Sequence, residues 1–410
     1  MELVKNLYLR FYFTIMALYV FLNKGIAYSY LAEILWLGGI VLLILNRKTL
    51  VIYWDKRVKI FVFFLLICFI YILRGLLVYP FMDVIRDSFI FQYGWFVFLI
   101  FLYANQQEEI WYRLFIIYKW FPLVALLNFI LQYFVPFFEK FALFGTVPLM
   151  LYKNGDMGVH LLISTILMLI YADKLSTKWK IGLLLLIIFD FLTLSAYSRS
   201  GMVSYLIGLF CFLYFSKSEN IKTTSKPFLK YIPWALIIVI PLYLTIQVRE
   251  NFQGRATGFE QIQKNVVSLA ANSDDPTLEK NILWRVIWWT NILDYSFTKE
   301  YFATGKGLGM SLAQSDDIKT SDEDLRSPHN FHLNIMARFG VLIFLLWLYW
   351  IYLLLKPIFK RQLNTVQLAI ACILMAFLFN ASFDVFLEGP MGAFPFWTWV
   401  GLLFVTEAHN

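Results

Sequence analysis

Apolar runs of nearly the length of a membrane-crossing helix follow one another along most of the chain. A helix needs roughly 20 apolar residues to cross about 30 Å of hydrocarbon. We therefore expect an all-α integral membrane protein with about 12 transmembrane helices. The runs are centred on residues 11–23, 30–46, 58–73, 88–104, 114–135, 157–172, 180–197, 201–216, 230–247, 336–355, 366–383 and 391–406.

The composition agrees with this class and excludes others. Hydrophobic residues make up 60% of the chain and charged residues 15%, whereas a soluble globular domain is roughly 45–50% apolar. The net charge of +8 does not indicate nucleic-acid binding, because the basic residues lie in short loops between apolar runs. Cys68, Cys211 and Cys372 lie inside apolar runs without metal-binding spacing, which predicts packing roles. We predict one polytopic domain over residues 1–410, embedded in a lipid bilayer.

The distribution of Lys and Arg predicts the orientation of the chain. An even number of spans places both termini on one side of the membrane. If that side is the cytoplasm, the cytoplasmic segments hold most of the Lys and Arg of the short loops, as the positive-inside rule requires. The long polar segment 248–335, between the ninth and tenth runs, then faces outward. An outward-facing site meets no ATP, so any bond formed there needs a donor that was activated beforehand.

This outward loop carries a pair of histidines beside the tenth run. His329 and His332 are three residues apart, and His329 follows Pro328. A helix is expected to begin near Asn330. Histidine is the usual general base for removing a proton from a hydroxyl group. We favour His329 as this base, with His332 as the alternative, and a structural hydrogen bond remains open for either residue.

Two arginines provide candidate anion-binding groups. Arg199 lies between Ser198 and Ser200 at the outer end of the run 180–197. An arginine at the margin of the hydrocarbon is costly unless it is paired or functional, and its guanidinium group suits phosphate oxygens. Arg285 lies in the Trp-rich stretch LWRVIWW, which we expect to form a helix at the membrane interface. Together they could bind a lipid pyrophosphate without metal; snorkelling or ordinary interfacial arginines are the alternatives.

The stretch GKGLGMS, Gly305 to Ser311, predicts a tight turn. It lacks the spacing of a nucleotide-binding loop. Glycines such as Gly307 and Gly309 would allow the backbone to approach a sugar or a phosphate. A plain turn is the alternative interpretation.

Acidic residues within the apolar part are few. Asp190 lies in the middle of a run, where it serves either as a proton-relay acid of a transporter or as a buried partner of the helix bundle. Asp384 and Glu388 lie in the loop before the last run. One isolated acid does not make a translocation path, so transport is the competing function rather than the favoured one.

The chain resembles the O-antigen ligase and O-antigen polymerase family. The resemblance rests on SRSG after the seventh run, LWRVIWW and GKGLGMS in the long loop, and SPHNFHLNIMARFG before the tenth run. It implies a multi-pass enzyme of the bacterial inner membrane whose active site faces the periplasm. Such enzymes move a glycan from undecaprenyl pyrophosphate to a hydroxyl acceptor, either lipid A-core in a ligase or a glycan repeat unit in a polymerase. We favour a ligase, with a polymerase and then a transporter or flippase as alternatives.

The resemblance also implies roles for individual residues. Arg199 and Arg285 would bind the pyrophosphate, and His329 would activate the acceptor hydroxyl. Transfer would invert the anomeric centre and would need no metal or other cofactor. Possible supporting residues are Ser198, Ser200, Gly307, Gly309, Asn330 and His332. One departure concerns Arg338, because many relatives carry an acidic residue shortly before the glycine at this place.

Overall fold

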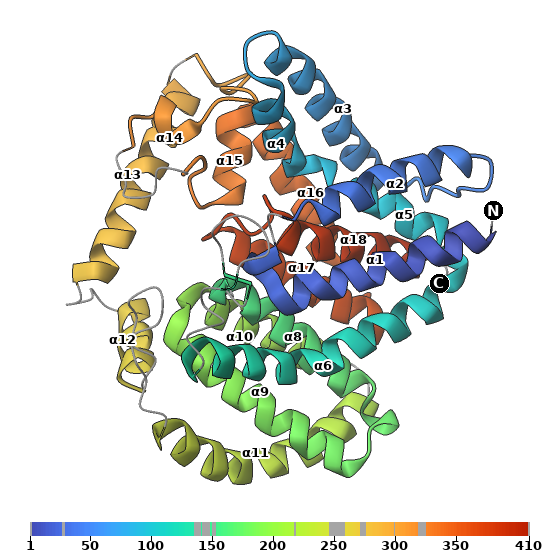
Figure 1. The fold of residues 1–410 in the computed structure, drawn as a ribbon, viewed down its shortest axis with the longest axis vertical. Helices are drawn as coiled ribbons and strands as arrows, with labels where there is room; N and C mark the ends of the chain where they lie inside the picture. Colours follow the sequence, from blue (N-terminus) through green and yellow to red (C-terminus); the bar gives the residue numbers. More distant parts are fainter. Residues whose placement is uncertain are drawn as a thin grey trace. The chain divides into compact units, whose positions relative to one another are not determined.

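The described part of the chain is helical. The computed structural model describes residues 2–26, 29–134, 141, 148–149, 153–216, 219–245, 259–270, 276–298, 300–318 and 325–408. Within these residues there are α-helices, short 3-10 helices and turns, and no β-strand (Figure 1). The predicted all-α class is therefore confirmed. Of the predicted loop 248–335, residues 248–258, 271–275, 299 and 319–324 lie outside the described residues.

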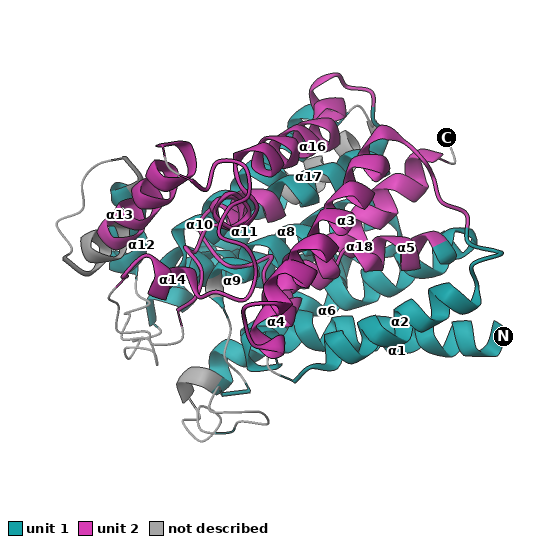
Figure 2. Cartoon of the chain, turned by 90° about the horizontal axis from the view of Figure 1, so that it is seen from above, with its two compact units in different colours: residues 1–50, 102–272, 363–376 teal, residues 51–101, 273–362, 377–410 magenta. Residues whose placement is uncertain are grey.

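The chain forms two compact units (Figure 2). Unit 1 comprises residues 1–50, 102–272 and 363–376, and unit 2 comprises residues 51–101, 273–362 and 377–410. Unit 1 holds α1 (Glu2–Leu22), α2 (Leu31–Leu45), α6 (Gln107–Phe134), α8 (Asn154–Ile170), α9 (Thr177–Tyr197), α10 (Arg199–Phe215), α11 (Glu219–Thr245), α12 (Phe259–Ala270) and the first part of α17 (Thr365–Ala381). Unit 2 holds α3 (Lys56–Leu76), α4 (Phe81–Gln92), α5 (Trp95–Leu102), α13 (Pro276–Thr298), α14 (Leu312–Ser315), α15 (Phe331–Phe339), α16 (Val341–Phe359), the end of α17 and α18 (Pro390–Ala408).

Some of the helices have the length and apolar character of membrane spans. Among the described residues, 4 helices qualify, or up to 5 if a bent pair is one span. They are Lys56–Leu76, Ala104–Leu131, Thr177–Tyr197 and Val341–Phe359, with Phe81–Gln92 and Trp95–Leu102 as the pair bent by 49°. Shorter apolar helices are Leu31–Leu45, Gly155–Ile170, Arg199–Phe215, Lys230–Thr245 and Thr365–Ala381. These helices agree with a membrane protein, while the number of 12 spans stays a prediction.

The tenth apolar run is not one helix, which corrects the sequence-based prediction for residues 336–355. The short helix α15 ends at Phe339, α16 begins at Val341, and Gly340 lies between them. Gly340 has φ 85°, a backbone conformation that glycine adopts without steric cost. The segment around Phe302 also lies close to Gly340. A Cβ atom on Gly340 would be 2.7 Å from the carbonyl oxygen of Phe302. The candidate span therefore starts at Val341.

We expect Gly340→Ala to destabilise the protein. The added methyl group meets both the unfavourable φ and the Phe302 carbonyl group, so the free energy of unfolding should fall by about 1–3 kcal/mol. Thermal unfolding of the purified protein in detergent would measure the change. Gly182→Ala, in α9, is the matched control, because a Cβ atom there meets nothing within 4 Å and alanine favours helix. Equal melting temperatures of the two variants would contradict the prediction.

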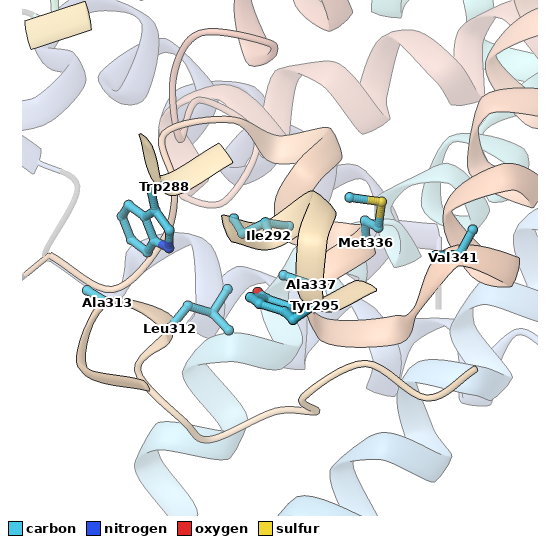
Figure 3. Packing of buried hydrophobic residues seen from close by; sticks show 8 residues of the cluster. All are labelled: Trp288, Ile292, Tyr295, Leu312, Ala313, Met336, Ala337 and Val341. Atoms are coloured by element: carbon cyan, nitrogen blue, oxygen red, sulfur yellow. The ribbon is translucent and has the colours of Figure 1, made fainter. Parts of the chain in front are cut away.

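A buried apolar cluster joins the helices around the long loop in unit 2 (Figure 3). Helix α13 contributes Trp288, Ile292 and Tyr295, which pack against residues of α14, α15 and α16. The other members are Leu312, Ala313, Met336, Ala337 and Val341. This packing fixes the position of α13, which carries Arg285, against α15, which begins two residues after His329.

Candidate active site

Arg285 is held against the segment between α17 and α18. It lies on α13, one turn before the buried Trp288, and is itself half-buried. Its Nη1 atom donates a hydrogen bond of 3.1 Å to the carbonyl oxygen of Phe383. Its guanidinium carbon also lies 5.4 Å from the ring centroid of Trp284. The helix predicted for this Trp-rich stretch is confirmed, while its location at the membrane interface stays a prediction.

His329 lies at the junction between the long loop and α15. Asn330 caps this helix, because its side-chain oxygen accepts hydrogen bonds of 3.1 Å from the N–H groups of His332 and Leu333. The predicted helix start near Asn330 is therefore confirmed. His329 itself has φ 51°, a conformation that costs a residue with a side chain about 1–3 kcal/mol. Strain of this kind is concentrated at functional sites, so the backbone conformation agrees with a functional role for His329.

Helix α13 contacts His329 and the residue before it. The imidazole ring stands perpendicular to the ring of Trp284, with 5.6 Å between the ring centroids. The indole nitrogen of Trp289 donates a hydrogen bond of 2.7 Å to the carbonyl oxygen of Pro328, the residue before His329. Helix α13 therefore positions both Arg285 and His329, and the structure brings these two predicted site residues together within unit 2.

A carboxylate from a distant part of the sequence faces His329. The Oδ1 atom of Asp384 lies 3.7 Å from Nδ1 of His329, and the side chains are 16% and 25% exposed. A carboxylate at this place favours a proton on Nδ1, which leaves the lone pair of the imidazole on Nε2. The sequence places Asp384 in the loop before the last run but assigns it no role. Its only signal there is an acid at the outer end of an apolar run.

His332 is engaged through both of its ring nitrogens. The indole nitrogen of Trp347 donates a hydrogen bond of 2.9 Å to Nδ1, and Nε2 lies 3.0 Å from the carbonyl oxygen of Leu378. Nδ1 is thus the acceptor, so Nε2 carries the proton and donates it. Burial lowers the pKa of His332, while the hydrogen bond to Leu378 acts in the opposite direction. The imidazole of His332 is therefore neutral, and both of its nitrogens are hydrogen-bonded within the protein.

The predicted glycine turn is present, and its N–H groups are bound within the protein. Gly305, Gly307 and Gly309 all have positive φ angles, of 56°, 90° and 99°. The N–H of Gly307 donates to the carbonyl oxygen of Arg338 at 2.9 Å, and that of Gly309 donates to the carboxylate of Asp87 at 2.9 Å. In this arrangement the two N–H groups hold the turn to α15 and α4.

Asp87 is the centre of a buried polar cluster that ties α4 to this turn and to α15. Besides Gly309, its Oδ2 atom accepts from Arg338 at 2.8 Å and lies 3.4 Å from Arg326. The side chains of Arg338 and Asp87 are only 3% and 5% exposed. Arg338 also donates to the side-chain oxygen of Asn334 at 2.9 Å. Arg338, the residue at which the sequence departs from the family pattern, thus forms a buried ion pair with Asp87.

Arg199 belongs to unit 1, where α12 holds it. Its Nη1 atom donates a hydrogen bond of 3.0 Å to the hydroxyl oxygen of Ser268. The hydroxyl of Ser198 caps α10 by accepting from the N–H of Gly201 at 3.1 Å, and it lies 3.2 Å from the hydroxyl of Ser200. Both serines therefore take part in the start of α10. Arg285 and His329 lie in unit 2.

These observations define a helical protein of membrane type that carries arginine, histidine and carboxylate groups at helix ends and in the segments between apolar helices. Residues 181–348, from α9 into α16, match the family model described as O-Antigen ligase. The matched segment includes Arg199, Arg285 and His329, so the resemblance drawn from the sequence is confirmed for this family. The coarse activity that follows is glycosyl transfer at a membrane. A search of curated proteins gives no match.

Proposed function

We propose that this chain transfers a glycan from undecaprenyl pyrophosphate to a hydroxyl acceptor on the periplasmic face of the bacterial inner membrane. The acceptor that we favour is lipid A-core, which would make the chain an O-antigen ligase. The observation that carries this proposal is the meeting of Arg285, His329 and Asp384 at one segment. Arg285 binds the carbonyl group of Phe383, and His329 faces the carboxylate of the next residue.

The chemistry requires a base, an anion-binding group and an activated donor. Nε2 of His329 takes the proton of the acceptor hydroxyl group, and the acceptor oxygen attacks the anomeric carbon of the donor glycan. The attack comes from the face opposite the pyrophosphate, so the bond between that carbon and the pyrophosphate oxygen breaks and the anomeric centre is inverted. Asp384 keeps a proton on Nδ1 and stabilises the imidazolium that forms. Arg285 binds the leaving pyrophosphate, whose negative charge increases as the bond breaks.

Arg199 is the proposed second ligand of the pyrophosphate. Support comes from its place within the matched family segment and from its position at the first residue of α10. Its hydrogen bond to the hydroxyl oxygen of Ser268 holds the guanidinium group beside the start of α10. The proposal requires no metal, because the two guanidinium groups supply the positive charge. It includes the 12 spans, the cytoplasmic termini and the periplasmic loop expected from the sequence.

Transport remains the second candidate function. Asp190 is 1% exposed within α9, and one of its carboxylate oxygens has no hydrogen-bond partner among the described residues. Buried acids of this kind occur in proton relays of transporters. A transporter would need Asp190 and would tolerate alanine at Arg199, Arg285 and His329, whereas the transferase needs those residues.

The lipopolysaccharide banding pattern of a deletion strain tests the function. Loss of all glycan from the core, with polymer accumulating on undecaprenyl pyrophosphate, is the result expected for a ligase. Core that carries a single repeat unit and no ladder would indicate a polymerase instead. An unchanged pattern would contradict both forms of the proposal.

Arg285→Ala should fail to restore the ladder in that strain. Loss of one charge-stabilising donor commonly lowers kcat by about 10²–10³-fold. Arg86→Ala is the matched control, because Arg86 lies in the same unit, is 56% exposed and pairs only locally with Asp83. Membrane levels of both variants should be measured by immunoblot. A normal ladder from Arg285→Ala would exclude the proposed pyrophosphate contact.

A further inference from the structure

His332 connects the two chain segments that carry His329 and Asp384. It lies three residues after His329, on the first turn of α15. Its Nε2 atom donates to the carbonyl group of Leu378, which lies six residues before Asp384 and close to the end of α17. The same imidazole therefore bridges the loop with the proposed base and the loop with its carboxylate.

The other side of His332 is attached to a rigid part of unit 2. Trp347, which donates to Nδ1, is fully buried at 0% exposure. Its ring contacts Phe64 of α3, with 5.9 Å between centroids, and Phe91 of α4, with 6.1 Å. It also stacks on Trp350 of α16 at 5.1 Å. A side chain fixed on several faces holds its hydrogen bond in one direction, so His332 has a firm anchor.

The hydrogen bonds also fix the chemical form of this imidazole. A second proton would have to sit on Nδ1, where it would face the N–H of Trp347, so two donors would meet. Burial also lowers the pKa of His332, which likewise favours the neutral form. His332 therefore keeps one tautomer and one charge while His329 exchanges protons.

We propose that His332 is a positioning residue that sets the distance between the imidazole of His329 and the carboxylate of Asp384. This inference rests on the proposed function, because it assigns His332 a task in the same site. Without the bridge, the end of α17 and the start of α15 lose a hydrogen bond that joins them, and we expect the contact of 3.7 Å between His329 and Asp384 to lengthen. A displacement of about 1 Å can lower a rate by about 10²-fold.

A pair of variants tests the bridge. In His332→Gln the amide can still accept from Trp347 and donate to Leu378, whereas His332→Leu has similar bulk and no hydrogen bond. We expect His332→Leu to lower kcat by about 10–100-fold with little change in KM, and His332→Gln to stay within about threefold of the wild type. The assay is transfer by the full-length protein in liposomes, from an undecaprenyl-pyrophosphate-linked glycan to purified lipid A-core.

The pH–rate profile separates positioning from a merely structural role. Among the described residues, the contacts place Asp384 directly beside His329 and Arg285 beside it through Trp284. When Asp384 moves away, the imidazolium loses its counter-charge, so the acidic limb of the kcat profile should move to lower pH in His332→Leu. If kcat of His332→Leu fell while the acidic limb of its pH–rate profile stayed in place, the inference would be overturned. Equal losses in the Gln and Leu variants would also overturn it.

A second variant covers the case in which His332→Leu does not fold. Trp347→Phe keeps the aromatic packing but removes the donor to Nδ1, and it should shift the acidic limb in the same direction by a smaller amount. An unmoved limb in Trp347→Phe would then overturn the inference. The proposed function fails separately, if His329→Asn transfers glycan at the wild-type rate. Full activity of His332→Leu beside an inactive His329→Asn would overturn only the positioning role.

Discussion

Replacing His329 by asparagine should lower kcat for glycan transfer by about 10²–10⁴-fold, because a general base contributes a factor of this size. Asparagine is the most informative replacement, because it tolerates the left-handed backbone conformation with φ 51° found at this position. Alanine would add backbone strain to the loss of the imidazole. The melting temperature of His329→Asn should therefore stay close to that of the wild type, and the loss should be chemical.

A double-variant cycle with Asp384→Asn shows whether the two residues act as a unit. Asp384→Asn alone should lower kcat by a smaller factor than His329→Asn, because the base remains. The double variant should be no slower than His329→Asn, since a positioning carboxylate has no effect without its imidazole. Transfer by purified protein in liposomes measures all three rates. Thr290→Ala, on the exposed face of α13, is the control. If the factors by which the two single variants lower kcat multiplied in the double variant, the proposed pair would be contradicted.

Much of the local structure follows from the sequence. The apolar runs predict helices because a helix satisfies its own backbone polar groups in an apolar setting, and α3 and α9 match predicted runs closely. The start of α15 follows from Pro328 and from Asn330, whose short side chain can cap a helix. The break at Gly340 does not follow from the sequence, because apolar residues continue on both sides of it and hydropathy alone indicates one span.

The contacts that complete the candidate site do not follow from the sequence. The glycine turn is bound by Asp87, which is 222 residues away from Gly309 along the chain. Asp384 likewise meets His329 through the packing of separate helices. A local pattern can show that glycines permit a turn, but the acceptor that takes their N–H groups depends on tertiary contacts. The same holds for His332, whose spacing from His329 leaves its role open until Trp347 and Leu378 are placed.

Arg338 illustrates how a departure from a family pattern can be accommodated. Where the resemblance drawn from the sequence implies an acid, this chain has a buried guanidinium group whose counter-charge is Asp87. The acid near the proposed base comes from Asp384 instead. The two carboxylates therefore have separate tasks, one in holding the loop and one beside the imidazole.

Asp87→Asn should strongly destabilise the protein, by about 3–5 kcal/mol in the free energy of unfolding, because it leaves the buried guanidinium group of Arg338 without its counter-charge. Asp83→Asn, on the same helix α4, is the matched control. Asp83 is 33% exposed and lies in surface ion pairs with Arg86 and Arg326, so its loss should cost less than about 1 kcal/mol. Denaturation of both purified variants in the same detergent compares them.

Replacing both buried partners distinguishes an unpaired charge from a general packing defect. The double variant Asp87→Leu with Arg338→Met removes both charges and keeps apolar bulk, so it should be more stable than Asp87→Asn. It should still transfer glycan slowly, because Gly309 loses the acceptor that holds the turn to α4. If the double variant were less stable than Asp87→Asn, the destabilisation would arise from packing. The pair would then not be the electrostatic clamp between α4 and α15 that the contacts describe.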